Sequence, residues 1–231
     1  MNAAVLLDPA RLDRPDTQVR LLPFPFLIAH GQLPDEARGE IERDFPRYAS
    51  AGFFPYDAAD CGPSVNSLVQ RLTSPEFASA VGRRLGIDNL GQFPTLVTLC
   101  RSLNKRHGTI HTDSKSKVAT ALLYLNAQWP DSSEGCLRFL NRIDDIDDMV
   151  VPELIPLYGE FAVFKRCDNS FHGHLPYEGE RRVIQVAWLT SEEEKLRKTK
   201  RGKFSRVFKK LFGSLDRRLG ADRDRSAAHR D

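Results

Sequence analysis

Two side chains that could bind a metal ion stand two residues apart in a segment with the composition of a strand. They are His111 and Asp113, within residues 108–113. In an extended strand, side chains at positions i and i+2 point to the same face, with Cα atoms about 6.6 Å apart, so this imidazole and this carboxylate can converge on one ion. A third ligand has to come from elsewhere in the chain. His172 meets this need 59 residues after Asp113 (172 − 113), at the end of another short stretch typical of a strand.

The donor set indicates which chemistry is possible. Two neutral imidazoles and one carboxylate on one face of an octahedron leave three positions open on Fe(II), enough for a bidentate 2-oxo acid and then O2. The single anionic ligand also leaves residual positive charge on the ion, which favours an anionic chelate. A His-x-Asp tripeptide alone is weak support, because a solvated turn can carry the same residues by chance. The residues around His172 therefore decide the interpretation.

The residues after His172 follow a specific order. Counting from His172, Pro176 falls at +4, Gly179 at +7 and Arg181 at +9, and a stretch with β periodicity follows. Together with the His-x-Asp pair, this order resembles the prolyl-4-hydroxylase-like branch of the Fe(II)- and 2-oxoglutarate-dependent oxygenases. The resemblance covers about residues 20–190. Further segments that resemble the family are 25–28, 33–34, 123–126, 134–139, 156–159 and Phe164.

The resemblance implies roles for five residues. His111, Asp113 and His172 would bind Fe(II). Arg181 would pair with the distal carboxylate of 2-oxoglutarate, and Tyr124 would donate to the same carboxylate. A guanidinium suits this task because it forms a bidentate, charge-assisted pair with a planar carboxylate.

The implied activity is that of a dioxygenase. It would use 2-oxoglutarate and O2, with ascorbate as a candidate reductant, to hydroxylate an unidentified substrate with release of succinate and CO2. Retention of Asp113 favours hydroxylation over halogenation, because a halogenase of this type needs that coordination position for chloride. Peptidyl proline, a free amino acid, a lipid and a sugar nucleotide all remain open as substrates.

Several positions near the site have competing interpretations. His174 shares a strand face with His172 and is the rival third ligand. Arg181 is followed by Arg182, and strand alternation turns only one of the two inward; the offset favours Arg181. Cys167 is either close to the iron or a small buried hydrophobe.

Two further positions leave the surroundings of the site open. Arg101 stands ten residues before the first ligand, where the family commonly has Tyr, so the wall of the cosubstrate pocket is uncertain. His107 either lines the mouth of the site or is an ordinary polar loop residue.

Two functions from other classes are also compatible with these residues. One is a catalytically inactive jelly-roll binding module that is recruited through its basic tail, although the intact ligands speak against it. The other is a zinc hydrolase that uses the same ligands. Such a hydrolase would need a nearby general base and would have no use for Arg181.

The pattern of elements predicts an α+β fold that is mainly β. Short β-branched and aromatic segments between polar or Gly/Pro turns predict strands over 95–102, 108–113, 117–126, 135–140, 160–166 and 181–189. Residues 20–30 form an apolar run with two prolines, which favours an edge strand. One helix is expected to begin at 33–36, and another to run from Ser74, as N-cap, to Gly86, as the C′ glycine. This order favours a double-stranded β-helix (jelly roll) core with supporting helices.

The charge distribution divides the chain. Residues 191–231 carry 14 Lys/Arg and 7 Asp/Glu, a net of +7, whereas the whole chain carries +3. We expect 1–19 to be an N-terminal lead-in with its first dozen residues unstructured, 20–190 to be the oxygenase domain, and 191–231 to be a basic tail.

The tail contains a pattern typical of a helix. Apolar residues recur every three or four positions over 203–219, with Lys and Arg on the opposite side, and this pattern predicts a C-terminal amphipathic helix. Such a helix suits an anionic membrane surface or a protein groove. Nucleic acid is disfavoured, because the stripe is too apolar for phosphate contacts alone.

Composition sets the remaining limits. The 231 residues, 41% of them hydrophobic, can bury one catalytic core. Four cysteines without a CxxC pair predict neither a zinc knuckle nor a disulfide framework, and they are typical of a reducing compartment. The N-terminus lacks a basic n-region, and no run of about 18 apolar residues exists. We therefore expect a cytoplasmic protein that can attach peripherally to a membrane surface.

Overall fold

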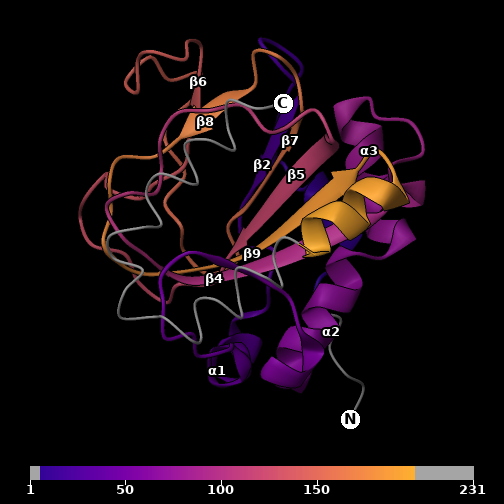
Figure 1. The fold of residues 1–231 in the computed structure, drawn as a ribbon, viewed down its shortest axis with the longest axis vertical. Coiled ribbons are helices and arrows are strands. Elements are labelled where there is room, and N and C mark those ends of the chain that lie inside the picture. The colour runs from indigo at the N-terminus through magenta and orange to yellow at the C-terminus, as the bar shows by residue number, and fades with distance from the viewer. Residues whose placement is uncertain (1–5, 201–231) are drawn as a thin grey trace.

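A large sheet and a small sheet face each other across an apolar interior (Figure 1). The computed structural model describes residues 6–200. The large sheet has seven strands in the order β1-β2-β7-β5-β9-β4-β3, all paired antiparallel, and the small sheet consists of β6 and β8. An isolated bridge between His111 and His172 extends the small sheet. These two layers form the jelly-roll core that the sequence predicts.

The bounds of the elements are as follows. The strands are β1 (Gln18–Arg20), β2 (Phe26–Ala29), β3 (Phe53–Pro55), β4 (Thr95–Leu103), β5 (Lys117–Tyr124), β6 (Arg138–Leu140), β7 (Phe161–Lys165), β8 (Phe171–Gly173) and β9 (Gly179–Leu189). The α-helices are α1 (Arg38–Asp44), α2 (Pro63–Leu72) and α3 (Pro75–Leu85), and residues 192–200 are also helical. Short 3-10 helices are η1 (Pro9–Asp13), η2 (Asp35–Ala37), η3 (Ala58–Asp60) and η4 (Leu90–Gln92).

Two apolar clusters cover the two faces of the large sheet, and β5 shows how one strand serves both. Its side chains alternate between faces, so Ala121 and Leu123 belong to the cluster formed with α2 and α3. Leu122 and Tyr124 point the other way, into the cluster between the two sheets. The helices thus brace one face of the sheet (Figure 1), while the opposite face lines the inside of the roll.

Helix α3 begins and ends where its caps predict. The Ser74 hydroxyl accepts a hydrogen bond from the N–H of Phe77 at 3.2 Å, and Pro75 occupies the first turn. Gly86 closes the helix with φ 62°, a left-handed conformation that glycine adopts without strain. The helix expected to begin at 33–36 is also present, as η2 followed by α1.

Two expectations about the elements were wrong, and one helix was missed. Strand β2 is not an edge strand, because it lies between β1 and β7 and all four of its residues are buried. Pro23 and Pro25 precede the strand, so neither removes a hydrogen bond from its ladder. Residues 108–113 form no strand beyond the single bridge at His111. Helix α2, which precedes α3 directly, was not predicted.

The start of the chain is more ordered than expected. Leu7 and Leu12 are buried in the cluster beneath the helices, and η1 carries Leu12 into it. The guanidinium of Arg84 in α3 donates to the carbonyl of Leu12 at 3.2 Å. From residue 6 onward, the expectation of an unstructured lead-in was therefore wrong. The predicted domain limits at 19 and 190 stay predictions.

Within residues 6–200, none of the helices combines the length and the apolar character needed to cross a bilayer. The amphipathic helix predicted over 203–219 lies outside the described residues. Its proposed attachment to a membrane surface or a protein groove therefore stays a prediction.

Candidate metal centre

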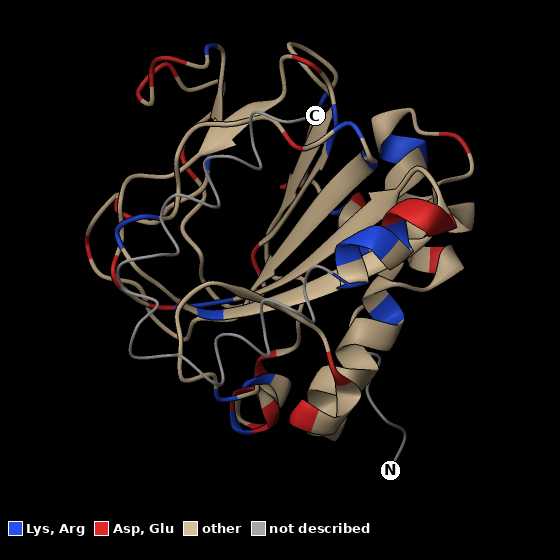
Figure 2. Ribbon diagram, in the orientation of Figure 1, with Lys and Arg blue, Asp and Glu red and all other residues tan. Residues whose placement is uncertain are grey.

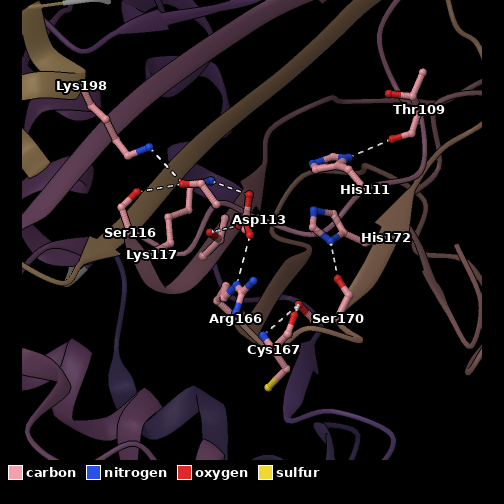
Figure 3. Close-up of polar contacts among 12 residues, drawn as sticks. Thr109, His111, Asp113, Ser116, Lys117, Arg166, Cys167, Ser170, His172 and Lys198 are labelled. Carbon is pink, nitrogen blue, oxygen red and sulfur yellow. Dashed lines mark hydrogen bonds and ion pairs between the residues drawn. The ribbon is translucent and has the colours of Figure 1, made fainter. Parts of the chain in front are cut away.

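Three donor side chains converge at one end of the roll. One ligand atom from each of His111, Asp113 and His172 lies within 4.8 Å of the other two, and no other such group of His, Cys, Asp or Glu exists among the described residues. We call these three residues the metal triad (Figure 3). His111 and His172 are joined by two backbone hydrogen bonds of 3.0 Å, which hold their Cα atoms opposite each other. Donors at about 2.1 Å from one ion lie about 3 Å apart, so small side-chain rotations suffice to bind a metal here.

Backbone carbonyls fix the orientation of both imidazoles. Nδ1 of His111 lies 2.8 Å from the carbonyl of Thr109, and Nδ1 of His172 lies 2.9 Å from the carbonyl of Ser170. Each Nδ1 therefore carries a proton and donates it, which leaves the Nε2 lone pair for a metal ion. Burial and the neighbouring His111 lower the pKa of His172 to about 3, so this ring is neutral at physiological pH.

Asp113 is held through both of its carboxylate oxygens. Lys117 Nζ lies 2.7 Å from Oδ1, and the hydroxyl of Thr120 donates to Oδ2 at 2.5 Å. Burial alone would raise the pKa of Asp113, but the ammonium of Lys117 and the adjacent His172 outweigh it and hold the pKa well below its usual range. The carboxylate is therefore ionised and oriented before any ion binds.

Thr120 and Lys117 were not predicted as parts of the site. Both lie on β5, and Thr120 sits on the inward face because it alternates with Ala119 and Ala121. A buried polar residue at an inward position of an otherwise apolar strand was the signal available in the sequence, since such groups normally have a hydrogen-bond partner.

Removing the hydroxyl of Thr120 should loosen the metal. We expect Thr120→Val, which keeps the shape of the side chain, to weaken Fe(II) binding by about 10–100-fold, because partners that orient a ligating group contribute this much. Competition with a coloured chelator measures the affinity. Thr120→Ser retains the hydroxyl and should stay near the wild-type value. Equal losses in the two variants would show that Thr120 acts only through packing.

His174 is not one of the converging donors. Its Nδ1 lies 2.8 Å from the carbonyl of Leu175, and its backbone N–H donates to Gly108 at 3.0 Å. Burial and the nearby Arg181 lower its pKa to about 4, so it is neutral. The geometry therefore favours His172 over His174 as the third ligand.

Within residues 6–200, Arg181 is a buried cation without a carboxylate partner. Its Nε donates to the carbonyl of Gly135 at 2.8 Å, its Nη2 donates to the Tyr124 hydroxyl at 3.1 Å, and its guanidinium lies 5.0 Å from the centre of the Tyr124 ring. Only 3% of Arg181 is exposed, and no ion pair joins it to any described Asp or Glu. Burial raises the pKa of Tyr124, so its hydroxyl keeps its proton and can donate it.

The other buried arginines show how unusual this is. Arg138 pairs with Asp147 and Glu153, and Arg182 pairs with Glu42 and Glu180. A buried charge is costly unless it is compensated, which these two are. Strand alternation predicts that Arg182 lies on the face of β9 opposite Arg181. Arg182 does lie on that face, but it is buried beneath Glu42 and Glu180.

One face of β5 connects the metal triad to Arg181. Thr120, Leu122 and Tyr124 alternate along its inward side, with Asp113 bonded at the first and Arg181 at the last. Four residues of strand span roughly 13 Å, and the side chains of Thr120 and Tyr124 at the two ends both point into the space between the sheets. This strand length sets the separation between the contact to Asp113 and the contact to Arg181.

The remaining candidates take no direct part in the triad. Cys167 is partly buried in a turn closed by its bonds with Ser170, and its sulfur points away from the triad (Figure 3). His107 caps its own loop through Asn104. Arg101 stands at the bulge of β4 and pairs with Glu180 at 2.9 Å, so it faces away from the interior.

A jelly roll with two imidazoles and one carboxylate at its mouth defines a mononuclear metal enzyme with open coordination positions. Comparison with protein families makes the class specific. Residues 98–190 match the family model of the 2OG-Fe(II) oxygenase superfamily, and this stretch contains the metal triad, Tyr124 and Arg181. The chain thus carries a domain of this superfamily and is a 2-oxoglutarate-dependent dioxygenase, whose cofactors are Fe(II), 2-oxoglutarate and O2.

Solved structures support the fold. The chain is similar to a prolyl-4-hydroxylase from Pseudomonas putida, with TM-score 0.50 and 19% identity over 72% of this chain and 92% of that one. It is similar to a prolyl hydroxylase from Trichoplax adhaerens in complex with a peptide fragment of hypoxia inducible factor, with TM-score 0.51 and 17% identity over 74% and 86%. A viral collagen prolyl hydroxylase from Paramecium Bursaria Chlorella virus-1 gives TM-score 0.51 and 14% identity over 72% and 90%. A search of the curated proteins finds no match.

Proposed function

We propose that His111, Asp113 and His172 hold the ferrous ion and that Arg181, assisted by Tyr124, binds the distal carboxylate of 2-oxoglutarate. The enzyme then hydroxylates a C–H bond of its substrate, with release of succinate and CO2. The observation that carries this proposal is the buried guanidinium of Arg181, whose partners in the described part of the chain are all neutral. A cosubstrate carboxylate would supply the missing counter-charge.

The residues of this chain position the reactants. Nε2 of each imidazole and one oxygen of Asp113 would bind the ion, while Lys117 and Thr120 keep the carboxylate in place. Arg181 and the Tyr124 hydroxyl would orient the 2-oxo acid along β5, with the apolar cluster between the sheets excluding water. The bound iron supplies the activation of O2 and the oxidation of the 2-oxo acid.

Anaerobic addition of Fe(II) and then 2-oxoglutarate tests the proposal. We expect a metal-to-ligand charge-transfer absorption band that needs both additions, and succinate formation once O2 is admitted with a substrate. A zinc hydrolase would give no such band with its own metal and would not depend on 2-oxoglutarate. An inactive binding module would bind neither component, and that result would reject the proposal.

A further inference from the structure

We propose that His174 positions 2-oxoglutarate indirectly, by holding the backbone groups that orient Arg181. The imidazole donates to the carbonyl of Leu175, that carbonyl holds Gly135, and Gly135 in turn holds the guanidinium. His174 is then a positioning residue and not a ligand of the iron. The inference rests on the proposed function, because it takes Arg181 as the anchor for the distal carboxylate.

Three hydrogen bonds link the His174 ring to the guanidinium. Nδ1 of His174 lies 2.8 Å from the carbonyl oxygen of Leu175, so this nitrogen carries the proton and donates it. The same oxygen accepts the backbone N–H of Gly135 at 3.1 Å. The carbonyl of Gly135 then accepts from Nε of Arg181 at 2.8 Å. One carbonyl oxygen thus holds both the imidazole and the glycine that binds the anchor.

The backbone of Gly135 depends on contacts of this kind. Its φ is 76°, and a Cβ there would lie 2.9 Å from the Trp129 ring and 3.0 Å from Tyr177, so the turn requires glycine. Glycine has the widest backbone freedom of any residue, and the direction of its carbonyl is therefore set by the groups around it. The bond to Leu175 restrains Gly135 on its N–H side.

His174 is itself held by the loop that carries His111. Its backbone N–H donates to the carbonyl of Gly108 at 3.0 Å. Its ring packs so closely on Gly108 that a Cβ at that position would overlap the imidazole. The loop before the first metal ligand therefore fixes His174, and His174 connects this loop to the backbone beside Arg181.

The His174 ring lies close enough to Arg181 to interact with it. Residues 171–177 contain no Lys, Arg, Asp or Glu, and β8 is drawn without charge in Figure 2. Burial, followed by the charge of Arg181, lowers the pKa of His174. The charge that acts most on the ring is thus that of the guanidinium, which comes from β9.

Exchanging the His174 ring for side-chain amides separates its two nitrogens. The amide nitrogen of Asn reaches about as far from the backbone as Nδ1, whereas that of Gln reaches about as far as Nε2. In the full chain loaded with Mn(II), calorimetric titration of 2-oxoglutarate measures the affinity. We expect the dissociation constant to rise by about 2–12-fold in His174→Gln and in His174→Leu, the value of one lost net hydrogen bond. His174→Asn should stay near the wild-type value.

Oxalate provides the matched ligand control. It chelates the ion through two carboxylate oxygens, but it is too short to reach Arg181. Its affinity for the Mn(II)-loaded protein should therefore be the same in the wild type and in all three variants. A general loosening of the metal site would instead weaken oxalate as much as 2-oxoglutarate.

The outcomes separate this inference from the proposed function. Unchanged 2-oxoglutarate affinity in Arg181→Ala would reject the anchor and the proposed function with it. If the anchor holds, wild-type affinity in His174→Gln and His174→Leu would overturn the role of His174 alone. Rescue by Gln but not by Asn, or equal losses of oxalate and 2-oxoglutarate, would overturn it as well. Thermal unfolding checks each variant, and if His174→Leu does not fold, the comparison of the Asn and Gln variants decides.

Discussion

Asp113→Ala should abolish iron-dependent turnover. The variant removes the one anionic ligand of the triad, and it leaves Lys117 as a largely buried ammonium without its partner. Changes to partners that only orient a ligand cost about 10–100-fold in metal affinity, so loss of the ligand itself should weaken Fe(II) binding by more than about 100-fold. Titration of Fe(II) under argon measures the affinity, and the charge-transfer band with 2-oxoglutarate should vanish.

Asp168→Ala provides the matched control. Asp168 lies four residues before His172 and pairs with Arg166, but its side chain is 86% exposed. Its removal should leave Fe(II) affinity unchanged. Wild-type affinity in Asp113→Ala would contradict the assignment of the triad and would require a different carboxylate. Thermal unfolding of both variants checks that a lost signal does not reflect a lost fold.

Arg181→Ala should affect the cosubstrate far more than the metal. A buried charge-assisted pair loses about 2–5 kcal/mol when one partner is truncated, so the dissociation constant for 2-oxoglutarate should rise by about 30-fold to more than 1,000-fold. Fe(II) affinity should stay within about 3-fold of wild type, because the two sites are separated along β5 and share no partner. Calorimetric titration of 2-oxoglutarate into the Mn(II)-loaded protein measures the first quantity, and a chelator competition measures the second.

Two further variants sharpen this test. Tyr124→Phe removes one donor and should cost about 2–12-fold in 2-oxoglutarate affinity, the value of a single net hydrogen bond. Arg182→Ala, the adjacent change on the other face of β9, breaks the pairs with Glu42 and Glu180 and should lower the melting temperature without changing cosubstrate affinity. Equal losses of metal and cosubstrate binding in Arg181→Ala would indicate misfolding rather than a missing anchor.

Short-range rules accounted for much of what could be predicted. The caps of α3 depend on Ser74 and Gly86 and on residues within one turn of them, so the sequence alone determines them. Helix α2 was missed although its period is present in the sequence, since Val65, Leu68 and Leu72 recur at three and four residues and Pro63 begins the helix.

Other features depend on strand order, which local patterns do not encode. The interior position of β2 follows from its pairing with both β1 and β7, and β7 lies more than 130 residues away in sequence. The two prolines before it suggested an edge only because their place relative to the ladder was unknown. Thr120 became part of the site for a similar reason: its contact with Asp113 depends on how the loop folds back on β5.

Residue spacing and the family resemblance led to the prediction of the metal triad and Arg181, but they did not predict the surroundings of these residues. The offset from His172 selected Arg181, whereas its lack of an acidic partner became visible only once Arg138 and Arg182 could be compared with it. The proline at +4 from His172 already favoured His172 over His174 in the sequence, and the bridge that places His172 opposite His111 supports the same choice.

The inward face of β5 has a consequence for cosubstrate choice. The strand is hydrogen-bonded to a neighbour on each side, so the distance from Thr120 to Tyr124 is fixed by the sheet and cannot stretch to suit a guest. For a diacid bound at both ends, the strand therefore sets the length that is accepted. A diacid with one methylene fewer would reach only one of the two binding groups, and a diacid with one methylene more would have to bend against Leu122. Rejection of such homologues would then come from the rigidity of the backbone, without a dedicated recognition residue.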